Sequence, residues 1–166
     1  MNRVAPHVDL SALGWVLNQL PPGIRRLLGE VDCIAGVDAI WMGVNTFHHT
    51  EDGRFYRDTS YVIPQCLQLH LPASMRATTM VLLSGDEGSI DVIRHELGHM
   101  LDDRMNYMRP DFEPLDSYAA TNHWEAFATA FQSWATEAGP DETFFHNRQR
   151  VLMDCPAAAA FFESFH

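Results

Sequence analysis

Residues 89–103 read SIDVIRHELGHMLDD, and the rest of the chain is interpreted outward from this stretch. Ser89 is a favourable N-cap residue, and Asp91 would lie in the first helical turn, where an acidic side chain is stabilised. The apolar residues recur at helical spacing; they are Ile90, Ile93, Leu97 and Leu101. We therefore predict an amphipathic helix that begins at Ser89 and buries one face.

The predicted helix contains an HExxH motif, His95-Glu96-Leu97-Gly98-His99. His95 and His99 lie about 40° apart on one helix face, roughly opposite the apolar stripe. Two neutral imidazoles at this spacing suit zinc, which takes nitrogen donors at about 2.0–2.1 Å. Glu96 is then placed to accept a proton from a zinc-bound water and to deliver it to a leaving amine. The alternative is a solvated helix face with two surface histidines.

A catalytic zinc site needs a third protein ligand and one open position. The HExxHxxGxxH continuation of the metzincins is absent, because Asp102 and Met105 stand where its glycine and last histidine would be. Glu125, near the start of a second predicted helix, is the better candidate, and His123 is the competing one. Glu125 also has a structural interpretation, because Asn122-x-x-Glu125 fits a broadened capping box.

Asp102 and Asp103 follow the motif on the same flank of the helix. A metal-bound histidine usually donates its second ring N–H to an acceptor, which fixes the tautomer and the orientation of the ring. Either carboxylate is placed to accept that hydrogen bond. The alternative is that both are solvated surface acids.

The remainder of the chain contains signals for helices on both sides of a group of short strands. Helices are predicted over 10–20, 24–30, 122–138 and, with an interruption near Pro156, 144–165; strands are predicted over 39–44, 61–63 and 78–83. Gly139-Pro140 is a strong signal for the end of the helix that carries Glu125. The order of helix, strands and then helices favours an α+β fold in one domain over 1–166.

Composition excludes several functions. The chain has 166 residues, of which 22 are acidic and 11 are basic, and its formal net charge is -11. All 11 basic residues are arginines, so mechanisms that need a lysine, such as a P-loop or a Schiff base, are excluded. The negative charge argues against nucleic acid as a partner, because such binding depends on a basic surface.

No stretch has the apolar length of a secretory signal or of a transmembrane helix. We therefore expect a soluble protein without a membrane partner, either cytoplasmic or delivered by a route that needs no signal peptide. Cys33, Cys66 and Cys155 are widely spaced and form no CxxC pair. We expect buried thiols instead of a disulfide or a thiolate zinc site.

Two stretches resemble one known family. Ile93–Asp103 resembles the catalytic helix of the anthrax lethal factor-type metallopeptidase domain. Tyr118–Phe131 resembles the second motif of that family, in which a tyrosine precedes a glutamate ligand by seven positions and a Phe-Ala-x-x-Phe pattern follows. Tyr118 and Glu125 keep that spacing here, and the pattern is kept by Phe127, Ala128 and Phe131.

The resemblance implies one Zn²⁺ per chain, held by His95, His99 and Glu125. It also implies that Glu96 is the general base and that Tyr118 donates a hydrogen bond to the oxyanion of the tetrahedral intermediate. The implied fold is zincin-like, with a small mixed sheet, an active-site helix and a second zinc-ligand helix. A protein or peptide substrate would then bind in extended form, by pairing with an edge strand.

The predicted function is therefore that of a zinc-dependent endopeptidase, and two alternatives stay open. One is an ImmA/IrrE-like regulatory metallopeptidase that cleaves a repressor; the spacing from Tyr118 to Glu125 favours the lethal factor type. The other is a non-catalytic, zinc-bound interaction module. One departure from related sites is Thr129, which stands four residues after Glu125, where an acid is often found.

Overall fold

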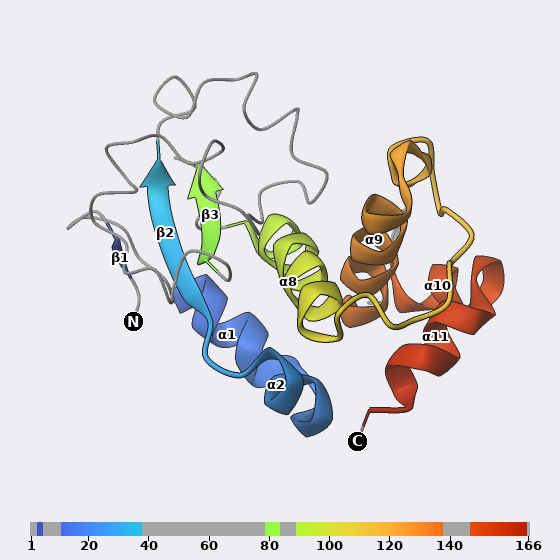
Figure 1. Ribbon diagram of the computed structural model, residues 1–166, viewed down its shortest axis with the longest axis horizontal. Coiled ribbons are helices and arrows are strands. Elements are labelled where there is room, and N and C mark those ends of the chain that lie inside the picture. The colour runs from blue at the N-terminus through green and yellow to red at the C-terminus, as the bar shows by residue number, and fades with distance from the viewer. Residues whose placement is uncertain (1–2, 5–10, 38–78, 84–88, 138–146, 166) are drawn as a thin grey trace.

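The computed structural model describes residues 3–4, 11–37, 79–83, 89–137 and 147–165 (Figure 1). Most of this part of the chain is helical. The helices are α1 (Ser11–Gln19), α2 (Pro22–Leu28), α8 (Ile90–Arg104), α9 (His123–Ala135), α10 (Arg148–Asp154), α11 (Pro156–Glu163) and the short 3-10 helix η1 (Ala119–Thr121). The strands are β1 (Arg3–Val4), β2 (Asp32–Val37) and β3 (Thr79–Leu83).

The three strands form one sheet in the order β1-β2-β3, and both neighbouring pairs are parallel. Arg3 lies opposite Ile34, and Asp32 lies opposite Thr79. Parallel neighbours need a crossover connection, and the segment that contains α1 and α2 provides it between β1 and β2. Among the described strands β3 lies at one end of the sheet, and α8 is the next described element.

The prediction of an α+β fold with a small mixed sheet is wrong. A mixed sheet needs an antiparallel pair, whereas every strand pair in the described ranges is parallel, and helices dominate those ranges. The strand at 79–83 was predicted, but β2 was not, because its sequence DCIAGV contains Asp and Gly, which are depleted in strands. The strands predicted over 39–44 and 61–63 lie outside the described residues.

Two helices, α8 and α9, begin where their capping residues predict, whereas α2 begins at Pro22 and not at 24, and α10 begins at Arg148 and not at 144. Ser89 accepts a hydrogen bond from Val92 N, and Asn122 accepts one from Glu125 N, so both are N-caps as predicted. α9 ends at Ala135, before the predicted 138, because Thr136 is already extended (φ -89°, ψ 112°). The C-terminal helical segment is divided into α10 and α11 at Cys155, next to Pro156. Each described helix is too short or too polar to cross a lipid bilayer.

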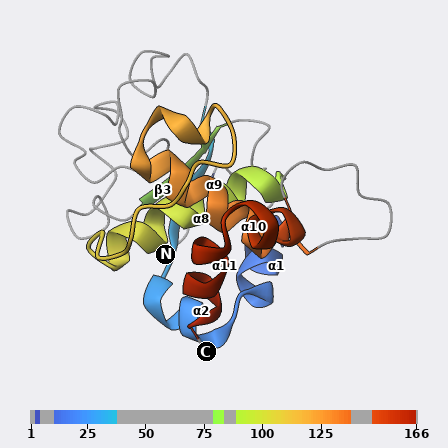
Figure 2. The ribbon, with the colours of Figure 1, turned by 90° about the vertical axis from the view of Figure 1, so that its right-hand side faces the viewer.

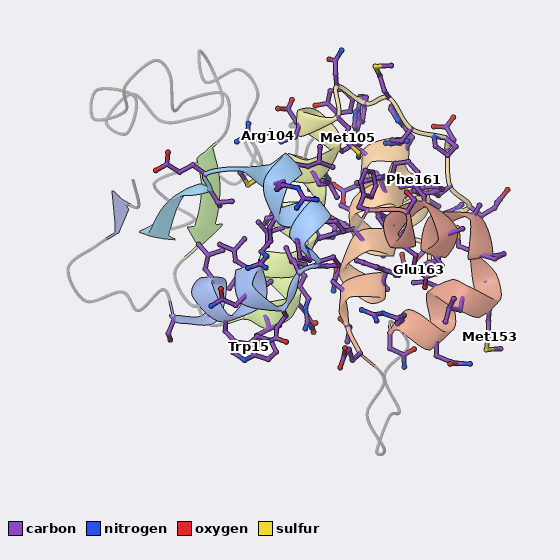
Figure 3. The ribbon with its side chains drawn as sticks, turned by 90° about the horizontal axis from the view of Figure 1, so that it is seen from below. Trp15, Arg104, Met105, Met153, Phe161 and Glu163 are labelled. Atoms are coloured by element: carbon purple, nitrogen blue, oxygen red, sulfur yellow. The ribbon has the colours of Figure 1, made fainter. Side chains whose placement is uncertain are left out.

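α9 occupies the centre of the helical part, with α8 on one side and α10 and α11 on the other (Figure 1, Figure 2). Apolar side chains of these helices, of α1 and of α2 form one core, which includes the buried Cys155. Phe162 of α11 is fully buried, and its ring centroid lies 5.3–5.4 Å from three rings of α9, those of Phe127, Phe131 and Trp134. Figure 3 shows Trp15 and Met153 on the outside of α1 and α10, where both are exposed.

Candidate metal centre

α8 carries both histidines of the motif into the interior. Three residues of its predicted apolar stripe, Ile93, Leu97 and Leu101, are fully buried in the core, whereas Ile90 in the first turn is exposed. The opposite face is buried as well, because the exposed fraction of the side chain is 12% for His95 and 1% for His99. The alternative of two solvated surface histidines is therefore wrong.

α9 brings Glu125 to the same place. Asn122 is the N-cap of α9, and its side-chain oxygen accepts a hydrogen bond from Glu125 N at 2.8 Å. The backbone of Glu125 thus takes part in capping, while its buried carboxylate is directed to the two imidazoles. The N-cap half of the predicted capping box is therefore confirmed, whereas the Glu125 side chain, which would complete the box, faces the histidines.

The three predicted ligands meet at a single point. Glu125 Oε2 lies 2.9 Å from His95 Nε2, and Glu125 Oε1 lies 3.5 Å from His99 Nε2. The two Nε2 atoms are 3.1 Å apart. Tetrahedral zinc with bonds of about 2.0–2.2 Å separates its ligand atoms by about 3.3–3.6 Å. Two imidazole nitrogens and a carboxylate oxygen at these separations fit one zinc ion after small side-chain adjustments.

A glycine allows the two helices to approach closely enough for this. A Cβ atom on Gly98 would lie 2.9 Å from Ala128 Cα and 3.1 Å from Ala128 O. Gly98 lies between the two histidines on α8, and Ala128 lies almost one turn after Glu125 on α9. The backbones therefore cross in direct contact beside the three ligands, which brings a carboxylate from one helix within reach of two imidazoles on the other.

The charges of the cluster are strongly coupled. Burial opposes ionisation of Glu125, but hydrogen bonds from His95 and His99 outweigh it and hold the pKa of the carboxyl group well below its usual range. Burial also disfavours the imidazolium of His95, yet the hydrogen bond to Glu125 and the charge of Glu96 raise the pKa of His95. Burial lowers the pKa of His99. These shifts favour the carboxylate form of Glu125 and the neutral form of His99, which are the forms that bind metal, whereas the raised pKa of His95 means that a metal ion competes with a proton there.

A smaller contribution to the raised pKa of His95 comes from Gln132 on α9, whose side chain lies near the imidazole. Asp102 and Asp103, the acceptors predicted from the sequence for a histidine N–H, accept hydrogen bonds from Arg109 and Tyr107, respectively.

The two predicted catalytic residues lie next to His95. Glu96 is buried, and it is close enough to His95 for its charge to raise the pKa of that imidazole. Tyr118, immediately before η1, is 57% exposed, and its ring centroid lies 5.9 Å from that of His95. An exposed phenol beside the cluster is accessible to a bound substrate.

The competing ligand His123 lies outside the cluster. Its exposed ring lies against Trp124, with the ring centroids 4.0 Å apart and the planes tilted by 35°. Thr129, which occupies the place of an acid in related sites, is buried one turn after Glu125. Its hydroxyl has no hydrogen-bond partner among the described residues. We therefore assign neither residue a role as a ligand.

Sequence analysis missed Arg109, which lies in the loop after α8. Its guanidinium binds both oxygens of Asp102, with Nε and Nη2 at 2.9 Å and 2.7 Å, and its Nη2 donates to the carbonyl of His123 at 3.1 Å. It also lies 4.9 Å from the centre of the Phe127 ring. An arginine before a proline in a polar loop carries no signal of burial, so only Asp102, an acidic residue seven positions earlier, could have pointed to it.

Comparisons with protein-family models, with curated proteins and with solved structures found no significant match to this chain. The resemblance to the lethal factor-type domain therefore rests on the two motifs alone. The two segments that carry these motifs, α8 and the stretch from Tyr118 through α9, are the segments that form the candidate metal centre.

Proposed function

We propose that this chain is a zinc-dependent endopeptidase that resembles the lethal factor-type metallopeptidases. The observation that carries the proposal is the convergence of His95, His99 and Glu125, whose potential ligand atoms all lie within 4.8 Å of one another. The cluster is buried, it joins two helices, and it has the donor set of two imidazoles and one carboxylate that catalytic zinc uses. Zinc bound there supplies a Lewis acid that activates water and polarises a carbonyl group.

Glu96 and Tyr118 have the chemistry that peptide hydrolysis needs from the protein. The Glu96 carboxylate accepts a proton from the attacking water and passes it to the nitrogen of the leaving amine, so that the group is regenerated in each turnover. The Tyr118 hydroxyl donates a hydrogen bond to the oxyanion of the tetrahedral intermediate. Burial of Glu96 and exposure of Tyr118 support this division of roles, because only the tyrosine needs to reach the substrate carbonyl.

The substrate in this proposal is a protein or peptide in an extended conformation. β3 supports this, because it lies at one end of the described sheet and contacts α8. A strand in that position offers main-chain groups to an extended peptide, and main-chain pairing binds peptides with little dependence on side chains.

The test uses zinc-loaded protein and a mixture of peptides of random sequence, with new N-termini identified by mass spectrometry. Glu96→Gln is expected to keep the zinc and the fold and to lose nearly all hydrolysis, because the amide cannot accept the proton. Glu113→Gln changes an exposed glutamate in the loop after Arg109 and is the matched control, with wild-type activity expected. Hydrolysis by Glu96→Gln at the wild-type rate would remove Glu96 from the mechanism.

Absence of hydrolysis by the zinc-loaded wild type would favour the non-catalytic interaction module. Hydrolysis that is confined to a folded repressor, with no cleavage of random peptides, would favour the ImmA/IrrE-like alternative. The proposal predicts cleavage within the peptides themselves, with Tyr118→Phe reducing the rate by about 10²–10³-fold without loss of zinc.

A further inference from the structure

The segment that carries Glu125 is held against α8 at two points. One point is the contact between Gly98 and Ala128, where the helix backbones touch. The other is the start of α9, where Arg109 joins the carbonyl of His123 to Asp102 on α8. Glu125 lies between these points in the sequence. The contact made by Arg109 lies at the start of α9, away from the crossing point, and so constrains the position of the first turn of α9 relative to α8.

The second point has a defined geometry. Arg109 binds Asp102 through two parallel hydrogen bonds of 2.9 Å and 2.7 Å, a bidentate arrangement that fixes the orientation of the guanidinium plane. The same guanidinium lies over the ring of Phe127, 4.9 Å from its centre. Arg109 therefore contacts α9 both at its first turn and at Phe127, two residues after Glu125.

Stability gives a poor explanation for this pair. Both side chains are buried, with exposed fractions of 2% for Arg109 and 1% for Asp102. Removing two charges from water is costly, and apolar side chains of similar volume often stabilise a protein as well as a buried ion pair does. Apolar side chains would not fix the relative orientation of the two segments. An arginine–carboxylate pair does, because its two parallel hydrogen bonds hold the groups that it joins in one orientation.

We propose that Asp102 and Arg109 are positioning residues of the metal centre, which hold the first turn of α9 so that the Glu125 carboxylate stays directed at His95 and His99. This inference rests on the proposed zinc site. Loss of the pair leaves all three ligands in the chain but lets their separation vary. Partners that orient metal ligands contribute about 10–100-fold to metal affinity, and we expect a loss of that size here.

The test compares two variants of the pair with a control in the metal-free and metal-loaded protein. Asp102→Leu combined with Arg109→Met removes both charges and leaves neither unpaired. Arg109→Lys keeps the positive charge but loses the planar, bidentate contact. The control is Val151→Ala, which removes buried volume from α10 and touches neither contact point. Stability is measured by thermal unfolding of the metal-free proteins, and zinc affinity by competition with a chelator.

The visible absorption spectrum of the Co²⁺-loaded protein separates a change at the metal site from a change in stability. Its intensity depends on the number and arrangement of the metal ligands, and a loss of stability alone leaves it unchanged. We expect both pair variants to bind zinc about 10–100-fold more weakly and to give an altered Co²⁺ spectrum. Val151→Ala should lose thermal stability but keep the wild-type affinity and spectrum.

Two results would overturn the inference and leave the zinc site intact. One is wild-type zinc affinity and a wild-type Co²⁺ spectrum in both pair variants. The other is a loss of zinc affinity that is proportional to the loss of thermal stability in the two pair variants and in Val151→Ala. A wild type that binds neither zinc nor Co²⁺ would overturn the proposed function, and the positioning role would fall with it.

Discussion

α9 has two faces of opposite character. The face toward α8 buries the Glu125 carboxylate against the two histidines and places Gln132 near His95. The face toward α11 packs aromatic rings around Phe162. Burial of apolar side chains stabilises a fold, whereas burial of a polar cluster costs free energy. A buried polar cluster therefore points to a functional role. We therefore expect changes on the aromatic face to alter stability and changes on the polar face to alter metal binding.

The largest effect on stability is expected on the aromatic face. Phe162→Ala removes a fully buried ring from the centre of the cluster and should reduce the free energy of unfolding by about 3–5 kcal/mol. Urea denaturation of the metal-free protein measures this loss. Zinc affinity of the folded fraction should stay within about threefold of the wild type, and a larger change would mean that the two faces are coupled.

A smaller loss is expected at the crossing point of α8 and α9. Gly98→Ala places a Cβ atom 2.9 Å from Ala128 Cα, so the helices must move apart. We expect a loss of about 1–3 kcal/mol in unfolding free energy together with weaker zinc binding. The matched control is Gly14→Ala in α1, where a Cβ atom meets nothing within 4 Å and a gain of about 0.5–1 kcal/mol is expected. Similar behaviour of the two variants would contradict the close approach.

On the polar face, Gln132 offers a test in which stability should hardly change. A polar side chain beside a metal-bound histidine helps to orient its ring. Gln132→Met removes the polar group near His95 while keeping the length of the side chain, and should weaken zinc binding by about tenfold. Gln132→Glu restores an acceptor and should restore the affinity, as measured by chelator competition. Equal zinc affinity in Met and Glu variants would show that Gln132 does not orient the histidine.

The smallest effect is expected at Thr129, a polar residue whose hydroxyl has no partner among the described residues. Thr129→Val keeps the shape and removes an uncompensated polar atom, so a gain of up to about 1 kcal/mol in unfolding free energy is expected. Thr136→Val is the control, because that hydroxyl accepts from Arg94 and donates to the carbonyl of Gln132. A loss of stability in Thr129→Val would reveal a hydroxyl partner.

The site was more predictable than the fold because its signals are local. The helix around His95 and His99 follows from an N-cap and a 3.6-residue period, and Asn122 caps the helix of Glu125 in the same way. The sheet depends on pairing between segments far apart in the chain. The sequence of β2 is short and contains Asp32 and Gly36, so neither its presence nor its parallel partners could be predicted.

Arg109 shows a different limit. Arg109 lies in a loop next to Pro110, but burial of its guanidinium depends on Asp102 from α8 and Phe127 from α9. Such a contact exists only once the two helices have packed. Gln132 was missed for the same reason, since it lies on a different helix from His95.

The most direct test of the metal centre is the zinc content of the purified protein beside that of Glu125→Ala, with Glu113→Ala as a matched control. We predict one zinc per chain in the wild type and in the control, and greatly weakened retention in Glu125→Ala. No zinc in the wild type, even after reconstitution, would contradict the peptidase proposal. Zinc held equally well by the wild type and Glu125→Ala would contradict Glu125 as the third ligand.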